Sequence, residues 1–241
     1  MIASESTLRS IALDQPATIR VFERFHLDYC CGGNRPLAAA CAEKGIAVEE
    51  VLAGLEQALA GTDVQAGLIQ SSLAGLIHHI VHTHHEYIRA ELPRLGAMAE
   101  RVATKHGPLH PEATLIQRDL AKLGDELLFH LNKEERILFP YIEGLERSRE
   151  QNTAPPSSCF GTVESPIQQM VNEHEGAAAL LNEMRAYANG FTPWAGACPT
   201  TVGLFHGLAE FERDLHRHVH LENNLLFPRA IAIEKEMPAA K

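Results

Sequence analysis

The sequence lacks any long apolar run. No stretch approaches the roughly 18–20 consecutive apolar residues that a membrane-spanning helix requires, so we expect no membrane segment and no membrane partner. The first residues, MIASESTLRSIALD, also lack the basic segment followed by an apolar segment that marks a secretory signal. Together these absences predict a cytoplasmic protein.

Cysteines spaced for pairing are missing as well. The chain has 5 cysteines, an odd number, and no two of them form a CxxC motif, which argues against a disulfide framework and favours a reducing compartment. Positive charge is also in deficit. A net charge of −10 repels nucleic-acid phosphates and anionic lipid, so we expect no nucleic-acid partner.

Histidine, by contrast, is abundant. The 14 His residues, together with 31 Asp and Glu residues, offer many nitrogen and oxygen ligands for a metal ion. Hydrophobic spacing is helical almost throughout, and no sustained two-residue alternation of β-branched and aromatic residues is present. We therefore predict an all-α fold.

Two segments rich in glycine, proline and small polar residues divide the chain. ALAGTDVQAG (58–67) separates a small helical unit, residues 1–60, from the rest. SREQNTAPPSSCFGTVESP (148–166) divides the remainder, residues 68–236, into two halves. We expect each half to supply two helices of one bundle.

The two halves share a motif. HLNKEERILFP in the first half and HVHLENNLLFP in the second both fit H-x3-E-x3-L-F-P, which is an internal repeat. Apolar residues, Ile137 among them, recur around each motif at steps of three and four, as on the buried seam of a bundle helix. This seam carries His130 and Glu134 in one repeat, and His218 and Glu222 in the other.

The spacing within each pair predicts a metal site. Residues four apart lie on one helix face, so the histidine and the glutamate of each pair point the same way. Burying an unpaired carboxylate costs several kcal/mol, and a metal ion that binds Glu and His directly removes that cost. An ion pair within the helix is the alternative, and it explains one pair better than two in repeat.

Each remaining helix carries a histidine on its apolar stripe. These are His85 in LAGLIHHIVHTHHEYIRAELPRL and His174 in SPIQQMVNEHEGAAALL. In an antiparallel pair of helices, residues at equal depth are equidistant from the loop. The midpoint between His85 and His130 falls in KHGPLHP, and that between His174 and His218 falls in FTPWAGACP. Both are strong turn signals, so we expect all four histidines at one level.

The choice of ligand in the first helix stays open, because His84 and His82 stand close to His85 in the sequence. One histidine from each helix and two glutamates give six ligands, enough for two ions if both glutamates bridge them. Mixed imidazole and carboxylate ligation suits iron best, and manganese or zinc less well. An oxo or hydroxo bridge would leave a coordination position open. Glu126 and Glu173 lie near the set as acceptors for ligand N–H groups or as additional ligands.

Three motifs together resemble one family. DYCCGG at 28–33, combined with the two H-x3-E-x3-L-F-P repeats, is similar to the repair-of-iron-centres (RIC) family of hemerythrin-like di-iron proteins, over nearly the whole chain. The resemblance implies a hemerythrin-like antiparallel four-helix bundle with a small N-terminal helical domain, and a non-haem di-iron site. By motif match, the family's ligands and additional acids fall on His85, His130, Glu134, His174, His218 and Glu222, and on Glu126 and Glu173.

The same resemblance implies a role in nitrosative and oxidative stress. Family members are associated with repair of damaged iron–sulfur clusters and with binding or reducing nitric oxide, so damaged iron–sulfur proteins, nitric oxide and oxygen are the expected partners. Whether the site turns over as an enzyme stays open. A non-catalytic scavenger or sensor of nitric oxide or oxygen is the alternative. Ala178 stands four residues after His174, where oxygen-carrying hemerythrins have another histidine, which weakens an oxygen-carrier interpretation.

The vicinal cysteines Cys30 and Cys31 need a separate interpretation. We interpret them as a reactive thiol pair for redox chemistry or transient binding of iron or nitric oxide, with a buried structural pair or a zinc site as alternatives. A helix expected to start near Asn34 would lower a thiolate pKa through its amide groups and dipole. The glycines that follow, Gly32 and Gly33, would allow another backbone to approach closely.

Overall fold

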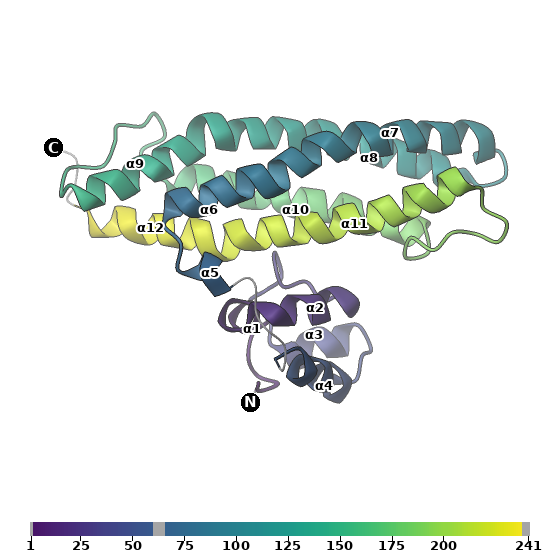
Figure 1. The fold of residues 1–241 in the computed structure, drawn as a ribbon, viewed down its shortest axis with the longest axis horizontal. Coiled ribbons are helices and arrows are strands. Elements are labelled where there is room, and N and C mark those ends of the chain that lie inside the picture. Colours follow the sequence, from purple (N-terminus) through teal and green to yellow (C-terminus); the bar gives the residue numbers. More distant parts are fainter. Residues whose placement is uncertain (1, 60–65, 238–241) are drawn as a thin grey trace.

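The computed structural model describes residues 2–59 and 66–237, and the described residues form helices joined by turns, with no β-strand among them. The predicted all-α class is confirmed. Figure 1 shows a long helical bundle with a small group of helices packed along one side of it. Within the described ranges, no helix combines the length and apolar character needed to cross a membrane.

The small group of helices is the N-terminal unit, which has its own apolar core. It contains α1 (Leu8–Asp14), the 3₁₀ turn η1 (Pro16–Thr18), α2 (Ile19–Arg24), α3 (Leu37–Glu43) and α4 (Val48–Leu59). The helix expected from Asn34 begins at Leu37 instead. The residues before it form a turn, in which the Arg35 N–H donates to the Gly32 carbonyl.

Four antiparallel rods make up the bundle, after the short helix α5 (Ala66–Ile69). Three rods consist of two α-helices joined by a π-helical turn, and the remaining rod is continuous. The rods are α6 (Leu73–Ile80), π turn Val81–His85 and α7 (Glu86–His106); α8 (Pro111–Lys133), π turn Glu134–Leu138 and α9 (Phe139–Glu150); α10 (Glu164–Tyr187); and α11 (Pro199–Leu221), π turn Glu222–Leu226 and α12 (Phe227–Glu236).

The connections agree with the turn signals in the sequence. KHGPLHP spans the turn between α7 and α8, and FTPWAGACP lies between α10 and α11. The predicted linker 148–166 contains the irregular segment between α9 and α10. The other predicted linker, 58–67, falls mostly on residues 60–65, which lie outside the described residues, so the domain division at residue 60 stays a prediction.

The π turns change which residues face the bundle interior. In each of them a backbone N–H donates to the carbonyl five residues earlier, as Phe139 does to Glu134. The extra residue rotates the following helix by about 100° relative to the seam before it. Ile137, which we expected on the buried seam, is therefore 52% exposed, and its neighbour Leu138 is buried. Pro140 lies two residues after Leu138, and its missing N–H favours a break in the regular hydrogen-bond ladder here.

Two apolar cores fill the bundle, one on each side of a polar layer. One core lies among α7, α8, α10 and α11 and ends at side chains such as Leu131 and Val219. The other lies among α6, α9, α12 and the start of α10, and begins at side chains such as Leu138 and Leu226. The π turns therefore sit where one core gives way to the other.

The N-terminal unit is held on the fourth rod by polar contacts. The Arg217 guanidinium donates two hydrogen bonds to the Glu23 carboxylate, at 2.6 and 2.8 Å. The Asn224 amide, which is buried, donates to the Tyr29 carbonyl at 3.1 Å and lies 2.9 Å from Nδ1 of His220. The loop that carries the vicinal cysteines is therefore fixed against the π turn of the fourth rod.

Replacing Asn224 with alanine should loosen this docking. The buried Tyr29 carbonyl and His220 ring nitrogen would lose their partner, which costs about 1–3 kcal/mol of unfolding free energy. Urea unfolding measures the change. Asn182→Ala, at an exposed position of α10, is the matched control and should stay within about 0.5 kcal/mol of wild type. Equal unfolding curves for the two variants would contradict the docking role of Asn224.

Candidate metal centre

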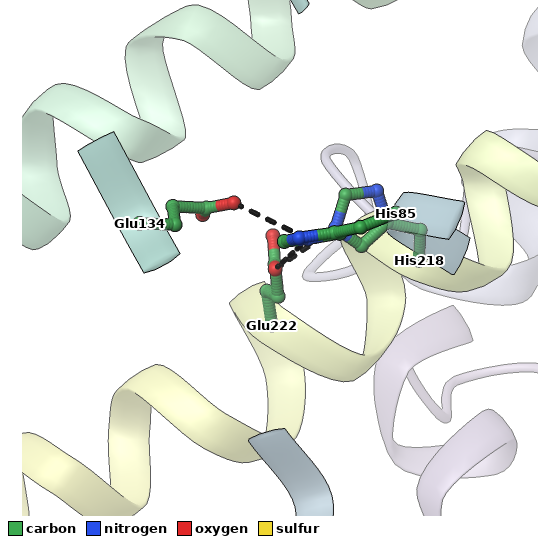
Figure 2. Close-up of side chains that lie close together, drawn as sticks. All are labelled: His85, Glu134, His218 and Glu222. Atoms are coloured by element: carbon green, nitrogen blue, oxygen red, sulfur yellow. Dashed lines mark hydrogen bonds and ion pairs between the residues drawn. The ribbon is translucent and has the colours of Figure 1, made fainter. Parts of the chain in front are cut away.

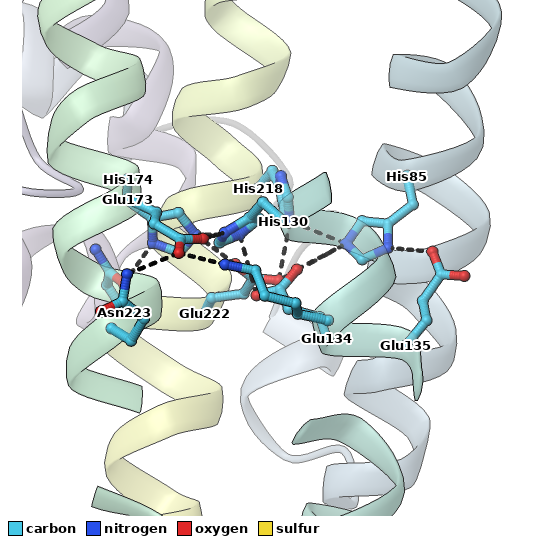
Figure 3. A network of polar contacts seen from close by, with 11 residues as sticks. His85, His130, Glu134, Glu135, Glu173, His174, His218, Glu222 and Asn223 are labelled. Atoms are coloured by element: carbon cyan, nitrogen blue, oxygen red, sulfur yellow. Dashed lines mark hydrogen bonds and ion pairs between the residues drawn. The ribbon is translucent and has the colours of Figure 1, made fainter. Parts of the chain in front are cut away.

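The polar layer between the two cores consists of six buried side chains. Each is at most 2% exposed, and every rod of the bundle contributes at least one. Figure 3 shows the layer, whose members are His85, His130, Glu134, His174, His218 and Glu222. These are the six ligands expected from the sequence, so the structure brings all of them together.

The six side chains form two groups of four that share both glutamates. In each group, one donor atom per residue lies within 4.8 Å of every other. His85 and His218 belong to the first group, with Nε2 atoms 3.1 Å apart (Figure 2). The second group contains His130 and His174, with Nε2 atoms 3.0 Å apart. Each group therefore takes one histidine from each half of the chain.

Most carboxylate oxygens of the layer lack an ordinary partner, and the exception is Glu222 Oε1, which lies 2.9 Å from His218 Nε2. Both oxygens of Glu134 and Oε2 of Glu222 are buried without a hydrogen bond from the described residues. Imidazole nitrogens stand at ion-pair distance, such as His174 Nε2 at 3.1 Å from Glu222 Oε2, but without hydrogen-bond geometry. A buried carboxylate in this state is costly unless a cation binds it. The donor set therefore fits a pair of metal ions.

The outer ring nitrogens of three of these histidines are held by named acceptors. His85 Nδ1 lies 2.8 Å from Glu135, His130 Nδ1 lies 2.7 Å from Glu173, and His174 Nδ1 lies 2.9 Å from Asn223. An acceptor at Nδ1 places the proton there and leaves the Nε2 lone pair directed at the centre, as in metal-bound histidines. Glu173 thus occupies the outer position expected of it.

Sequence reasoning missed Glu135 and Asn223, although the repeat contains the signal for both. Each residue directly follows the shared glutamate of its motif, in the Glu134–Glu135 and Glu222–Asn223 pairs. The π turn that starts at the glutamate directs the next side chain toward the histidine of a neighbouring rod. The two motifs therefore repeat both an inner ligand and an outer support.

The other two candidate ligands of the first rod, His84 and His82, do not belong to the buried layer. His84 is buried, but its Nδ1 lies 2.9 Å from Asp214. His82 is on the exposed face, where its Nδ1 lies 2.6 Å from Glu86. Of the three histidines that the sequence left open, His85 is the one whose nitrogen belongs to a four-donor group.

The pKa values of the layer depend on the carboxylates that contact its histidines. Burial lowers the pKa of His130, but the Glu134 and Glu173 carboxylates raise it to about 10. The same hydrogen bond with His130 lowers the pKa of Glu173 to about 2. Burial lowers the pKa of His218, which has no acceptor at Nδ1 among the described residues. Glu173 therefore stays ionised as the acceptor of His130 across the physiological range.

The Phe of each L-F-P motif covers a histidine of the layer. Phe139 stacks on His85, with ring centroids 5.7 Å apart and an interplanar angle of 20°. Phe227 stacks on His174, at 6.2 Å and 4°. Each ring belongs to the residue directly after a π turn and is part of the second apolar core, so this core packs directly against the layer.

Comparison with known proteins decides the family. Residues 76–230 match the model of the hemerythrin HHE cation-binding domain, and residues 4–59 match a domain of unknown function named ScdA_N. The chain is 35% identical to the iron–sulfur cluster repair protein YtfE of Escherichia coli O17:K52:H18 over 234 residues, which cover 97% of this chain and 100% of that protein. This chain belongs to the repair-of-iron-centres family.

Other relatives in the family agree over the same length. YtfE of Pectobacterium atrosepticum is 34% identical over 96% of this chain and 99% of its own. YtfE of Citrobacter koseri is 35% identical over 95% of this chain and 98% of its own. The matched cation-binding domain and the buried His–Glu layer together indicate an iron-binding site, and the hemerythrin-like bundle expected from the sequence is confirmed.

A cavity of about 300 Å³ reaches the layer of this RIC-family bundle from the α8–α10 face. His130 and His174 form its floor, and Phe129 and Glu173 line it. Glu126, the other additional acid expected from the sequence, also lines this cavity but is largely exposed and lies 3.9 Å from Lys122. Its role as an additional ligand or acceptor therefore stays a prediction.

The vicinal cysteines lie next to the layer rather than far from it. Asp28 Oδ1 accepts hydrogen bonds from the Cys30 and Cys31 amides, at 3.1 and 2.9 Å, and lies 3.2 Å from Cys30 Sγ. The Asn223 amide lies 4.0 Å from Cys31 Sγ, and its oxygen accepts from the His174 ring. One side chain therefore connects the thiol pair to a residue of the layer.

The expected lowering of the thiol pKa is wrong for Cys30. The hydrogen bond to Cys31 and burial raise the pKa of the Cys30 thiol well above its ordinary value. The helix after the motif starts only at Leu37, so its N-terminus does not offset these two effects, and the Asp28 carboxylate beside the sulfur raises the pKa further. Cys30 is thus a buried thiol that stays protonated at neutral pH.

Cys198 shows the opposite behaviour at the far end of the bundle. It precedes α11, and its Sγ lies 3.4 Å from Thr201 Oγ1 and 3.3 Å from His106 Nε2. Hydrogen bonds from Thr201 and then His106 lower the pKa of the Cys198 thiol to about 6. Sequence analysis did not predict this lowered pKa, because His106 is distant from Cys198 along the chain.

Removing the Glu173 carboxylate should weaken metal binding. Without its acceptor, His130 would lose its fixed tautomer, and loss of such an outer partner typically lowers metal affinity about 10–100-fold. Competition with a chromophoric ferrous chelator measures the affinity of Glu173→Leu. Glu175→Leu, at an exposed position of the same helix, is the control and should match wild type. Equal affinities for the two variants would contradict the supporting role.

Alkylation by iodoacetamide should separate Cys198 from Cys30. A lowered pKa favours the thiolate above about pH 6, so Cys198 should react readily at pH 7 and slowly at pH 5. Cys30 should stay unmodified at both values, because its pKa is raised. Mass spectrometry of peptides gives both rates. Thr201→Val should move the Cys198 profile to higher pH, and an unmoved profile would contradict the assignment.

Proposed function

We propose that this chain is a cytoplasmic di-iron protein that repairs damaged iron–sulfur clusters under nitrosative and oxidative stress. The observation that carries the proposal is the pair of buried four-donor groups sharing Glu134 and Glu222, with a thiol pair one side chain away. The names of its full-length relatives, iron–sulfur cluster repair proteins, support the same function. They do not support the scavenger or sensor alternative.

The residues that would hold the two ions divide by group. His85 and His218 would bind one iron, His130 and His174 the other, and the two shared glutamates would bridge them. Bound iron would supply redox chemistry, open positions for a diatomic ligand such as nitric oxide or oxygen, and iron itself for a damaged cluster. An oxo or hydroxo bridge and the reduction of nitric oxide stay predictions.

The protein's own residues prepare this site. Glu135, Glu173 and Asn223 hold the outer nitrogens, so the Nε2 atoms already point at the centre, where a bound metal would displace any proton they carry. The two stacked Phe rings exclude water from one side of the layer. The cavity on the α8–α10 face gives a small ligand access to the His130 and His174 side.

Cys30 and Cys31 are proposed as the transfer point between this site and a damaged iron–sulfur protein. Together with Asp28 they form a three-donor group near the surface of the bundle. The raised pKa of Cys30 keeps its thiol protonated until a cation arrives, because metal binding favours the thiolate. Asn223 donates toward Cys31 and accepts from His174, so it positions the thiol pair against the layer.

The test combines iron analysis with repair. Tag-free protein purified without oxygen should contain two iron ions per chain and should reactivate a hydratase whose [4Fe–4S] cluster has been damaged by nitric oxide. Cys30→Ser/Cys31→Ser should keep its iron and lose most of the reactivation. Cys159→Ser, at an exposed cysteine, is the matched control. Nitrous oxide measured in the headspace after adding nitric oxide shows whether reduction accompanies binding.

Each measurement has a separate result that would contradict its part of the proposal. A protein with fewer than two irons would overturn the di-iron assignment, and a protein with two irons that fails to reactivate the hydratase would overturn the repair function. Equal repair by the double cysteine variant and by Cys159→Ser would overturn the role of the thiol pair alone.

A further inference from the structure

A second set of metal-ligating side chains lies outside the buried layer. His78 and His82 are exposed on the outer face of the first rod, where α6 passes into its π turn. Their rings stand close, with centroids 4.2 Å apart and an interplanar angle of 49°. Neither residue belongs to the groups that form the buried centre. Two imidazoles one helical turn apart on one face are an arrangement that chelates transition-metal ions.

The hydrogen bond behind His82 prepares it as a ligand. Its Nδ1 lies 2.6 Å from the exposed carboxylate of Glu86, four residues later. This acceptor places the proton on Nδ1 and leaves the Nε2 lone pair free. The buried His85–Glu135 and His130–Glu173 pairs have the same arrangement.

We propose that His78 and His82, with Glu86 supporting His82, form an exposed binding site for a divalent late transition-metal ion. Imidazole nitrogens favour ions such as Ni²⁺, Cu²⁺ and Zn²⁺ over Mg²⁺ and Ca²⁺, which prefer oxygen. Because both side chains are exposed, water completes the coordination sphere. The net charge of −10 attracts cations to the protein. The site is independent of the proposed repair function.

Three other exposed or half-buried histidines each lack one of these features. His206 lies 3.6 Å from Glu210, also four residues later, but has no second imidazole in contact among the described residues. His106 and His110 are already engaged, by Cys198 and Glu112, and both pack on Trp194. His206 therefore offers a matched control, with the carboxylate and without the chelating partner.

The experiment titrates tag-free, iron-loaded protein with Ni²⁺ in a calorimeter. Wild type should bind one Ni²⁺ per chain in addition to its iron, with the iron content unchanged before and after. His78→Ala/His82→Ala should lose this binding. Glu86→Gln should weaken it about 10–100-fold, the usual effect of losing an outer carboxylate. His206→Ala should bind Ni²⁺ as wild type does. Cu²⁺ should bind more tightly than Ni²⁺, and Co²⁺ less tightly.

Three results would overturn the proposal. They are wild-type protein that takes up no Ni²⁺, a double variant that binds Ni²⁺ as wild type does, and a His206→Ala variant that loses as much binding as the double variant. Equal circular dichroism and equal iron content among the variants show that each is folded, so a lost signal reports on the exposed histidines themselves.

Discussion

The burial of two carboxylates among four imidazoles is the constraint on which the rest of the structure depends. Glu134 and Glu222 sit in the bundle interior, and three of their four oxygens have no hydrogen-bond donor from the described residues. Such a layer is unfavourable without cations, so stability and metal binding are linked here. The apolar cores on both sides hold the rods in register, and the outer acceptors hold the rings. The packing of the four rods and the placement of the metal-ligating side chains therefore depend on each other.

The repeat explains why each motif is longer than a ligand pair. Its His and Glu supply donors to both groups, the residue after Glu supports a histidine of another rod, and Phe covers a histidine. The π turn makes these roles compatible, because one added residue turns the helix after the glutamate onto a new face. Pro follows where the regular hydrogen-bond ladder has already been interrupted.

The sequence predicted the all-α class, the four-helix bundle and the level at which six donors meet, because these follow from periodicity and loop position. It could not predict the π turns, which depend on packing around the layer. For that reason Ile137 was expected inside, and His84 could not be separated from His85, since a π turn buries both. The raised pKa of Cys30 also escaped prediction, because it arises from a thiol neighbour, burial and the Asp28 carboxylate.

Two consecutive asparagines, Asn223 and Asn224, occupy the π turn of the fourth rod with different tasks. One contacts a histidine of the layer and a cysteine, and the other anchors the loop that carries both cysteines. The small unit and the bundle are consequently not interchangeable modules. A bundle fused to a different N-terminal unit would keep all six metal-ligating side chains. The Asn223 amide beside His174 would, however, lose its contact with Cys31 Sγ.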